Sequence, residues 1–217
     1  MERSLLQTNS AAYLAAPSAI PGNRKPKYPG ADEDKLSSPT YRHKHHELPS
    51  CDICSRCVGK DDEVCDIALE KTCAELKCHQ EETRKCERLE QSKRIAVAAK
   101  EGSSVTQEEM EEGLEAQKPR IHYGLIASGS KVMKSGEDRD EVVSKSKDII
   151  AFEMEGAGVW ETIPCFIIKG VCDYADCHKG DKWQRYAAAT AAACMKAFLE
   201  RWRPTADQLQ KVSSRGE

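Results

Sequence analysis

The chain has few aromatic residues, and those it has are unevenly placed. Only 6% of the 217 residues are Phe, Trp or Tyr, and every Trp and Phe lies at or beyond Phe152. No Phe, Trp or Tyr occurs between Tyr41 and Tyr123. Because aromatic side chains bury the largest areas in a core, we expect a compact core only after about residue 119.

The sequence also lacks long apolar runs and a strong net charge. Its apolar runs fall well short of the roughly 18 residues that a membrane-spanning helix requires, and Met1 leads into no signal-peptide core. The formal net charge is -3 and the pI is near 6.1, so no global field attracts nucleic acid or an anionic bilayer. We therefore expect an intracellular, cytoplasmic protein without a nucleic-acid or membrane partner.

Proline is concentrated near the N-terminus and absent from the middle of the chain. Six prolines lie within the first 50 residues, which favours loops. Residues 60–118 contain no proline and carry 16 acidic and 10 basic residues, a composition typical of solvated helices. Thr106 can cap a helix at 107–116. A narrow apolar stripe, with spacings of four, four and three residues, marks one face of an earlier helix. It consists of Cys65, Leu69, Cys73 and Leu76.

Beyond Pro119 the pattern changes to short apolar runs that alternate with helical segments. Strands are expected at residues 123–128, 149–152 and 165–171, and helices at 137–147, 156–162 and 182–201. This alternation predicts an α/β fold with a parallel sheet covered on both faces. The predicted organisation has four parts: a loop-rich segment (1–50), a Cys-rich and charged helical insertion (51–118), an α/β half (119–204) and a flexible tail (205–217).

Acidic residues follow two of the apolar runs, at the point where each run ends. Glu153 and Glu155 come directly after one run, and Asp173 follows the next. Because ligands collect beyond the carboxyl ends of parallel strands, we expect Glu155 and Asp173 to face one crevice. Burial there would raise the pKa of Asp173 and suit it to general acid catalysis. The alternatives are that Asp173 only caps a turn and that Glu153 is a surface charge.

Four sequence blocks in fixed order connect this half to a known family. They are GLIASG at 124–129, FEMEGAG at 152–158, KGVCDYADCHK at 169–179 and WQRYAAATAAA at 183–193. Together they resemble the purine nucleoside phosphorylase and methylthioadenosine/adenosylhomocysteine nucleosidase superfamily, in particular its fungal branch. The resemblance covers only the second half of that family's domain. It implies a partial three-layer α/β/α fold with a mostly parallel sheet.

The resemblance implies cleavage of the N-glycosidic bond of purine nucleosides, with phosphate as a possible co-substrate and no other cofactor. Asp173 would be the catalytic acid that protonates the base. Glu155 would bind the ribose hydroxyls and favour an oxocarbenium-like transition state. The other substrate-binding residues implied are Met154, Val132, Met133 and Glu153.

Departures from the family pattern leave the enzyme assignment open. Ser130-Lys131 stands where relatives have Asn-Gln, and Lys169 stands where they have Arg. Lys cannot replace Arg at a site that needs two parallel hydrogen bonds from one side chain. The first half of the domain, which supplies the phosphate or water pocket, has no counterpart. The alternative is a non-catalytic nucleoside-sensing or protein-interaction module, with a partner or a second copy bound through residues 60–118.

Cysteine is abundant, with eleven residues in the chain. Without a short, secreted chain a disulfide framework is not indicated, so we expect reduced thiols. One CxxC motif lies near several histidines and a further cysteine, a donor set that suits zinc. The residues are His43, His45, His46, Cys51, Cys54 and Cys57. Because only one clean pair is present, the sequence favours a reduced Cys-rich loop, assigns no metal ligand and leaves zinc binding open.

Overall fold

A computed structural model of the chain describes residues 3–16, 26–47, 51–78, 83–84 and 86–202. The predicted tail at 205–217 lies outside the described residues. The elements, in chain order, are α1 (Arg3–Ala15), η1 (Ala31–Glu33), β1 (Leu36–Ser37), α2 (Asp52–Arg56), α3 (Asp66–Leu69), β2 (Thr83–Arg84), α4 (Glu87–Lys100), α5 (Gln107–Gln117), β3 (Leu125–Ser128), α6 (Gly136–Lys145), β4 (Ile149–Glu153), α7 (Gly156–Val159) and α8 (Gln184–Leu199).

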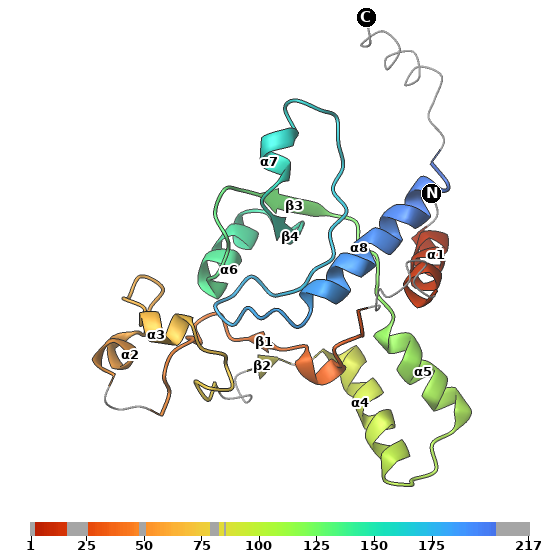
Figure 1. Cartoon of the computed structure of the whole chain (residues 1–217), viewed down its shortest axis with the longest axis horizontal. Coiled ribbons are helices and arrows are strands. Elements are labelled where there is room, and N and C mark those ends of the chain that lie inside the picture. Colours follow the sequence, from red (N-terminus) through yellow and green to blue (C-terminus); the bar gives the residue numbers. More distant parts are fainter. Residues whose placement is uncertain (1–2, 17–25, 48–50, 79–82, 85, 203–217) are drawn as a thin grey trace, which may run out of the picture.

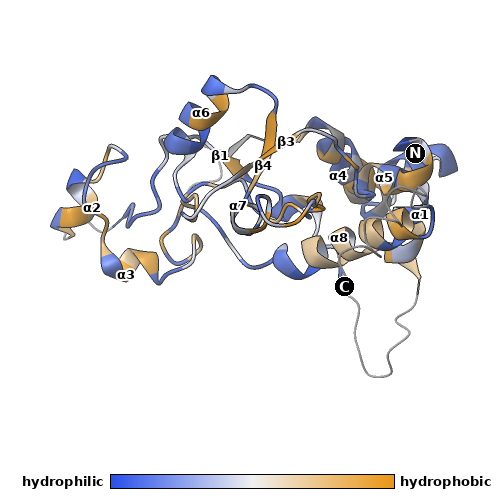
Figure 2. Ribbon diagram, turned by 90° about the horizontal axis from the view of Figure 1, so that it is seen from above, coloured by the Kyte–Doolittle hydropathy of each residue, from blue (hydrophilic) through white to orange (hydrophobic). Residues whose placement is uncertain are grey.

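Strands β3 and β4 form a parallel pair in the upper part of the molecule (Figure 1). Their register aligns Ser128 with Glu153, so both strands end at the same edge. Helix α6 connects them, and Ser135 caps its first turn by accepting a hydrogen bond from the Asp138 backbone N–H. The two strands and the helix between them confirm the predicted βαβ unit at 123–152, and α7 and α8 confirm the next two helices. Figure 2 shows the hydrophobic character of the strands against the more hydrophilic α6.

The third predicted strand, at residues 165–171, does not form. This segment lies against α8 instead of pairing with a described strand. A Cβ atom at Gly170 would sit 2.0 Å from the carbonyl oxygen of Ala187, and the Phe166 ring packs 4.7 Å from that of Phe198. Residues 165–171 therefore pack against α8 and do not form sheet hydrogen bonds with any strand that the structure describes. The three-layer architecture stays a prediction, since the described sheets each have two strands.

The predicted loop-rich segment is partly helical, because α1 occupies residues 3–15. That prediction was wrong here for a local reason: the first proline is Pro17, so nothing interrupts the Ala- and Leu-containing stretch before it. The helix packs on α8, where the buried Leu6 and Ala197 contribute to the contact region and the Lys196 ammonium lies 4.2 Å from the centre of the Tyr13 ring.

Helices α4 and α5 form a hairpin that extends from the lower part of the molecule (Figure 1). The Ser92 hydroxyl donates a hydrogen bond to the carbonyl of Gly113 across the pair, at 2.9 Å. Thr106 caps α5 through a full capping box with Glu109, as predicted. These contacts confirm helical structure in the charged stretch and the helix expected at 107–116; residues 101–106 separate α4 from α5.

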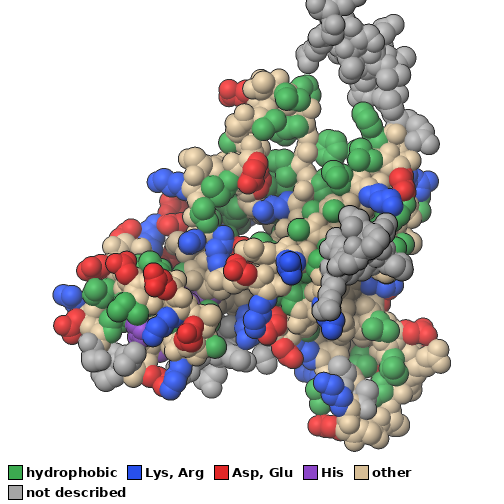
Figure 3. All heavy atoms as spheres, viewed as in Figure 1, with side chains coloured by type: hydrophobic (Ala, Val, Ile, Leu, Met, Phe, Trp, Pro, Cys, Tyr) green, Lys and Arg blue, Asp and Glu red, His purple; other side chains and the backbone are tan. Residues whose placement is uncertain are grey.

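Residues 41–47 and 51–78 form a separate end of the molecule, here called the Cys/His lobe. It has its own core of buried side chains: Cys54, Cys65, Ala68 and Leu76. The expectation that a core would form only after residue 119 was therefore wrong. The predicted helical stripe is wrong as well, because α3 ends at Leu69, which is 60% exposed. Figure 3 shows charged side chains on the outside of this lobe and histidine among them.

In the part of the chain that the structure describes, no helix is both long enough and apolar enough to cross a membrane. The longest, α8, has 16 residues.

Candidate metal centre

Cysteine and histidine side chains of the Cys/His lobe converge in a first cluster, made of His45, Cys51, Cys54 and Cys65. One potential ligand atom from each residue lies within 4.8 Å of the other three. Cys51 and Cys54 flank the first turns of α2, and Cys65 precedes α3, so two short helices bring three sulfur atoms together. Cys54 and Cys65 are buried at the centre of the lobe.

The spacing of these atoms matches a tetrahedral metal site. With zinc–sulfur bonds of about 2.3 Å, the sulfur atoms of a tetrahedron lie about 3.8 Å apart. The Sγ atoms of Cys51 and Cys65 are 3.8 Å apart, and His45 Nδ1 lies 3.3 Å from the Cys54 Sγ. All eleven cysteines of the chain are free. The first cluster is therefore arranged around a shared centre rather than as a disulfide.

A second cluster joins the lobe to the C-terminal part of the chain and consists of His43, Cys73, Cys78 and His178. The Cys73 Sγ lies 3.6 Å from His43 Nδ1 and 3.5 Å from His178 Nδ1. The Cys78 Sγ lies 3.9 Å from the same His43 nitrogen. Both histidines thus present Nδ1 to one point.

The opposite ring nitrogen of each of these histidines contacts a backbone carbonyl. His43 Nε2 lies 2.9 Å from the oxygen of Lys71, and His178 Nε2 lies 3.1 Å from that of Tyr41. A carbonyl can only accept, so it places the proton on Nε2 and leaves the Nδ1 lone pair free for a cation. Metal-binding histidines characteristically use their second nitrogen in this way.

The electrostatics of the second cluster favour a cation at its centre. Hydrogen bonding from Cys78, together with the two histidines, lowers the pKa of Cys73 to about 2 against the effect of burial. The pKa of the Cys78 thiol is raised by its interaction with Cys73 and by burial. Burial opposes the charged form of His178, yet hydrogen bonds and charge interactions with Cys177 and Cys73 raise its pKa to about 10. A divalent ion would replace the proton that the Cys73 sulfur attracts.

In the first cluster, too, one thiol has a lowered pKa and another has a raised pKa. Hydrogen bonds from Cys54, beginning with its backbone N–H, lower the pKa of Cys51. Burial raises the pKa of Cys54 to about 11. Metal ligation would deprotonate the second thiol, because a bound cation stabilises the thiolate.

The residues that the sequence singled out for zinc separate between these clusters. His45, Cys51 and Cys54 lie in the first and His43 in the second. His46 stacks on the Tyr41 ring instead, with centroids 4.8 Å apart. Cys57 is buried but belongs to neither cluster.

The sequence prediction missed four members of these clusters: Cys65, Cys73, Cys78 and His178. Cys73 and Cys78 are separated by four residues, a spacing within the usual range for paired zinc ligands. That signal was available. His178 had none, because it lies 105 residues beyond Cys73 in the chain.

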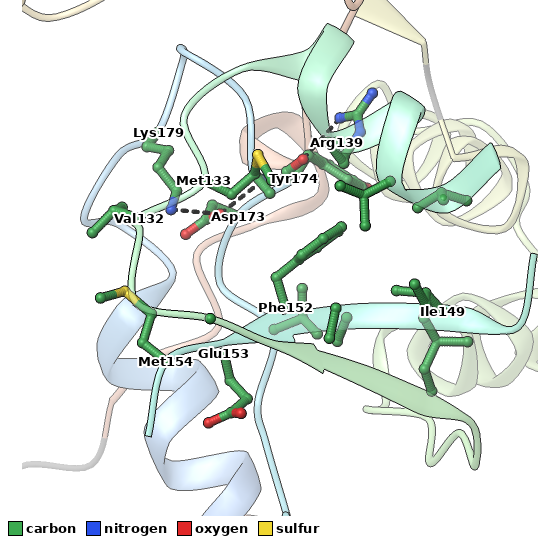
Figure 4. Close-up of a pocket in the computed structure, with 18 of the residues that line it drawn as sticks. Val132, Met133, Arg139, Ile149, Phe152, Glu153, Met154, Asp173, Tyr174 and Lys179 are labelled. Atoms are coloured by element: carbon green, nitrogen blue, oxygen red, sulfur yellow. Dashed lines mark hydrogen bonds and ion pairs between the residues drawn. The ribbon is translucent and has the colours of Figure 1, made fainter. Parts of the chain in front are cut away.

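The residues predicted for nucleoside binding line an open cavity of about 1140 Å³ that extends from the carboxyl ends of β3 and β4 back along β4, where Ile149 and Phe152 also line it (Figure 4). All six contribute to its wall: Val132, Met133, Glu153, Met154, Glu155 and Asp173. Glu155 and Asp173 thus share one cavity. Basic side chains of Lys131, Arg139 and Lys179 lie in the same wall.

Two of these carboxylates have structural partners. The Glu153 carboxylate accepts hydrogen bonds from the backbone N–H groups of Glu155 and Gly156, at 2.8 and 2.7 Å, and so holds the turn that leads into α7. Burial opposes ionisation of Glu153, but hydrogen bonds from Ser128 and these amides outweigh it and lower its pKa. Figure 4 shows the Glu153 side chain extending away from Asp173. Asp173 accepts from the Ala175 backbone N–H at 2.9 Å, which is the turn-capping alternative.

Comparison with known proteins gave one named relative at significant similarity. The chain is 47% identical over 81 residues to a "Nucleotide-binding leucine-rich repeat (NLR)-like protein" from Hyaloscypha variabilis (strain UAMH 11265 / GT02V1 / F). The match covers 37% of this chain and about 8% of the relative's length. No protein-family model and no solved structure matches the chain.

This relative overturns the predicted kinship with nucleoside phosphorylases and nucleosidases. The named protein is NLR-like, and no family model or solved structure supports the superfamily indicated by the four sequence blocks. The predicted cleavage of purine nucleosides is corrected on the same ground, and the comparison does not clearly favour the alternative of a nucleoside-sensing or protein-interaction module.

Proposed function

We propose that the chain is a zinc-binding module whose two metal centres fold the Cys/His lobe and fasten it to the rest of the molecule. The observation that carries this proposal is the convergence of two complete sets of four cysteine and histidine ligands. Four protein ligands and no open position are typical of structural zinc sites, in contrast to catalytic ones.

The donor atoms select the metal. Three thiolates and one imidazole in the first cluster, and two of each in the second, suit zinc. Calcium and magnesium prefer oxygen ligands, and neither cluster contains a carboxylate. The reduced, unpaired state of the cysteines is the state that metal ligation requires.

The composition of the lobe explains why a metal would be needed. Its buried core is small, with Leu76 as the one large aliphatic side chain among Cys54, Cys65 and Ala68. Small segments bury too little apolar surface to pay the conformational entropy of folding, and a structural metal is a common solution. Zinc would provide the missing folding free energy through metal–ligand bonds that form only in the folded chain.

Metal analysis of the purified protein tests the proposal, with a matched pair of variants. Wild-type protein prepared with zinc should hold two zinc ions per chain. Cys54→Ser should hold one fewer, whereas Cys57→Ser should retain both, because Cys57 is equally buried but lies in neither cluster. Wild-type protein that binds no zinc, or an equal loss in both variants, would overturn the proposal.

A further inference from the structure

Residues 173–179 connect the second cluster to the cavity. Asp173, Tyr174 and Lys179 line the cavity, and the Lys179 ammonium lies 3.4 Å from the Asp173 carboxylate (Figure 4). His178, one residue before Lys179, is a member of the second cluster. One short segment therefore supplies both a cavity wall and a metal ligand.

This segment contains neither helix nor strand, so separate contacts hold it in place. At its first end the Arg139 guanidinium donates to the carbonyl of Tyr174 at 2.8 Å, and the Tyr174 hydroxyl donates to Asp34 at 2.6 Å. At its other end the contacts are to the Cys/His lobe. The His178 ring stacks on Tyr41 with centroids 5.1 Å apart and faces the Cys73 sulfur.

The backbone between these ends is strained. Ala175 has a φ of 55°, a left-handed conformation that residues with a side chain rarely adopt. Asp173 and Asp176 each accept a hydrogen bond from the backbone two residues later, which tightens two successive turns. Strained backbone of this kind persists only where the surroundings hold it.

We infer that a metal ion in the second cluster fixes the cavity wall, so that metal occupancy controls the shape of the cavity. The ion would bind His178 to Cys73, Cys78 and His43, and it would hold the strained turns against the rigid lobe. The first cluster has no ligand in this segment, so it would not exert the same control. The inference rests on the proposed zinc binding.

Hydrogen exchange of the full chain, read by mass spectrometry, tests the inference. In the zinc-loaded wild type the amides of residues 173–179 should be protected. Cys73→Ser should lose one zinc ion and speed exchange in this segment by about tenfold or more, because the ion no longer anchors it. The matched variant Cys54→Ser should lose one zinc ion from the first cluster and leave exchange in residues 173–179 unchanged.

A second variant and a second measurement guard against misfolding of Cys73→Ser. His178→Gln removes the ligand from the opposite end while keeping every cysteine, and it should reproduce the faster exchange. Cys172 lines the cavity and is half-buried, so its alkylation by iodoacetamide should accelerate in both variants.

The outcomes separate this inference from the proposed function. Loss of zinc from Cys73→Ser with unchanged exchange at 173–179 would overturn control of the cavity and leave zinc binding intact. Full zinc content in both Cys73→Ser and His178→Gln would show that the second cluster is no metal centre, while the first stands. A wild type without zinc would instead refute the proposed function itself.

Discussion

The Cys/His lobe and the α/β half (residues 119–202) differ in how well they bury their large apolar side chains. The lobe lies in the stretch without Phe or Trp, yet it buries Leu76 and Cys54 to 2% and 1% exposure. The α/β half contains every Trp and Phe, yet leaves Trp160 and Phe166 63% and 59% exposed. Hydrophobic content alone therefore does not say where a chain packs. Under the proposed function, converging metal ligands organise the core of the lobe, where little apolar area is buried.

Removal of zinc should have the largest effect, and outside the Cys/His lobe it should reach only residues 173–179, which the second cluster anchors through His178. Structural zinc sites contribute roughly 10–16 kcal/mol of apparent binding free energy near neutral pH, which is comparable to the whole stability of a typical domain, about 5–15 kcal/mol. A strong chelator should therefore unfold the Cys/His lobe and leave the β3–β4 pair and α8 intact. Hydrogen exchange before and after chelation measures this. Equal loss of protection in both regions would show that the lobe and the α/β half are not distinct in the way described.

Gly170→Ala should have the next largest effect, and it should destabilise the α/β half without affecting the Cys/His lobe. Its new methyl group would lie 2.0 Å from the Ala187 carbonyl oxygen, so residues 165–171 would have to move away from α8. We expect a destabilisation of about 1–3 kcal/mol, the usual cost of overpacking. Urea denaturation followed by tryptophan fluorescence reports it, because all Trp residues lie in this half. Unchanged zinc content would confirm that the damage is confined there; Gly158→Ala, which meets no atom within 4 Å, is the control.

Thr106→Ala should act more weakly and touch neither region. It removes the capping box of α5, which costs about 1 kcal/mol at a typical helix N-terminus. Thermal unfolding should show a small decrease in stability, and amides in the first turn of α5 should exchange faster. Replacement by Ser retains the capping hydroxyl and should be close to neutral. Equal destabilisation by Ala and Ser would argue against a capping role.

The ion pairs between the lobe and α6 should have the smallest effect, and it should depend on pH. The Lys60 ammonium lies 2.8 Å from Asp138 and 3.2 Å from Glu141, and it lowers the pKa of Asp138. The pKa of Glu141 is lowered by Lys145 first and by Lys60 second. Because folding lowers these carboxyl pKa values, their contribution is present above the unfolded values of 3.8 and 4.5 and is lost as pH falls through the folded ones.

Lys60→Ala should therefore reduce stability slightly at neutral pH, and added salt should shrink the difference. Thermal unfolding of the zinc-loaded proteins at low and high salt measures it. A difference that grows with added salt would contradict the assignment of these pairs.

Helices and strands were predictable from the sequence where the residues that stabilise them are neighbours in the chain. The apolar runs at β3 and β4, the helix between them and the capping box at Thr106 depend on neighbouring residues, and the structure confirms them. The run at 165–171 has the same apolar pattern but forms no strand, because contact with α8 decides its position. Periodicity could not reveal that contact.

The metal clusters depend on the folded path of the chain rather than on local pattern. Cys65 and Cys73 were spaced to share a helical face, but α3 ends between them and they enter different clusters. The CxxC of the first cluster and the Cys73–Cys78 pair of the second can be found by spacing. His178 comes from a distant turn and could be assigned only once the lobe and residues 173–179 were placed together.

X-ray absorption spectroscopy of the zinc-loaded protein tests the central claim most directly. The first cluster offers three sulfur atoms and one nitrogen, and the second offers two of each. The average zinc coordination shell should therefore be dominated by sulfur at about 2.3 Å, with nitrogen at about 2.0–2.1 Å. A shell of this composition, at two zinc ions per chain, would support the account. Oxygen-dominated coordination without zinc–sulfur scattering would contradict it.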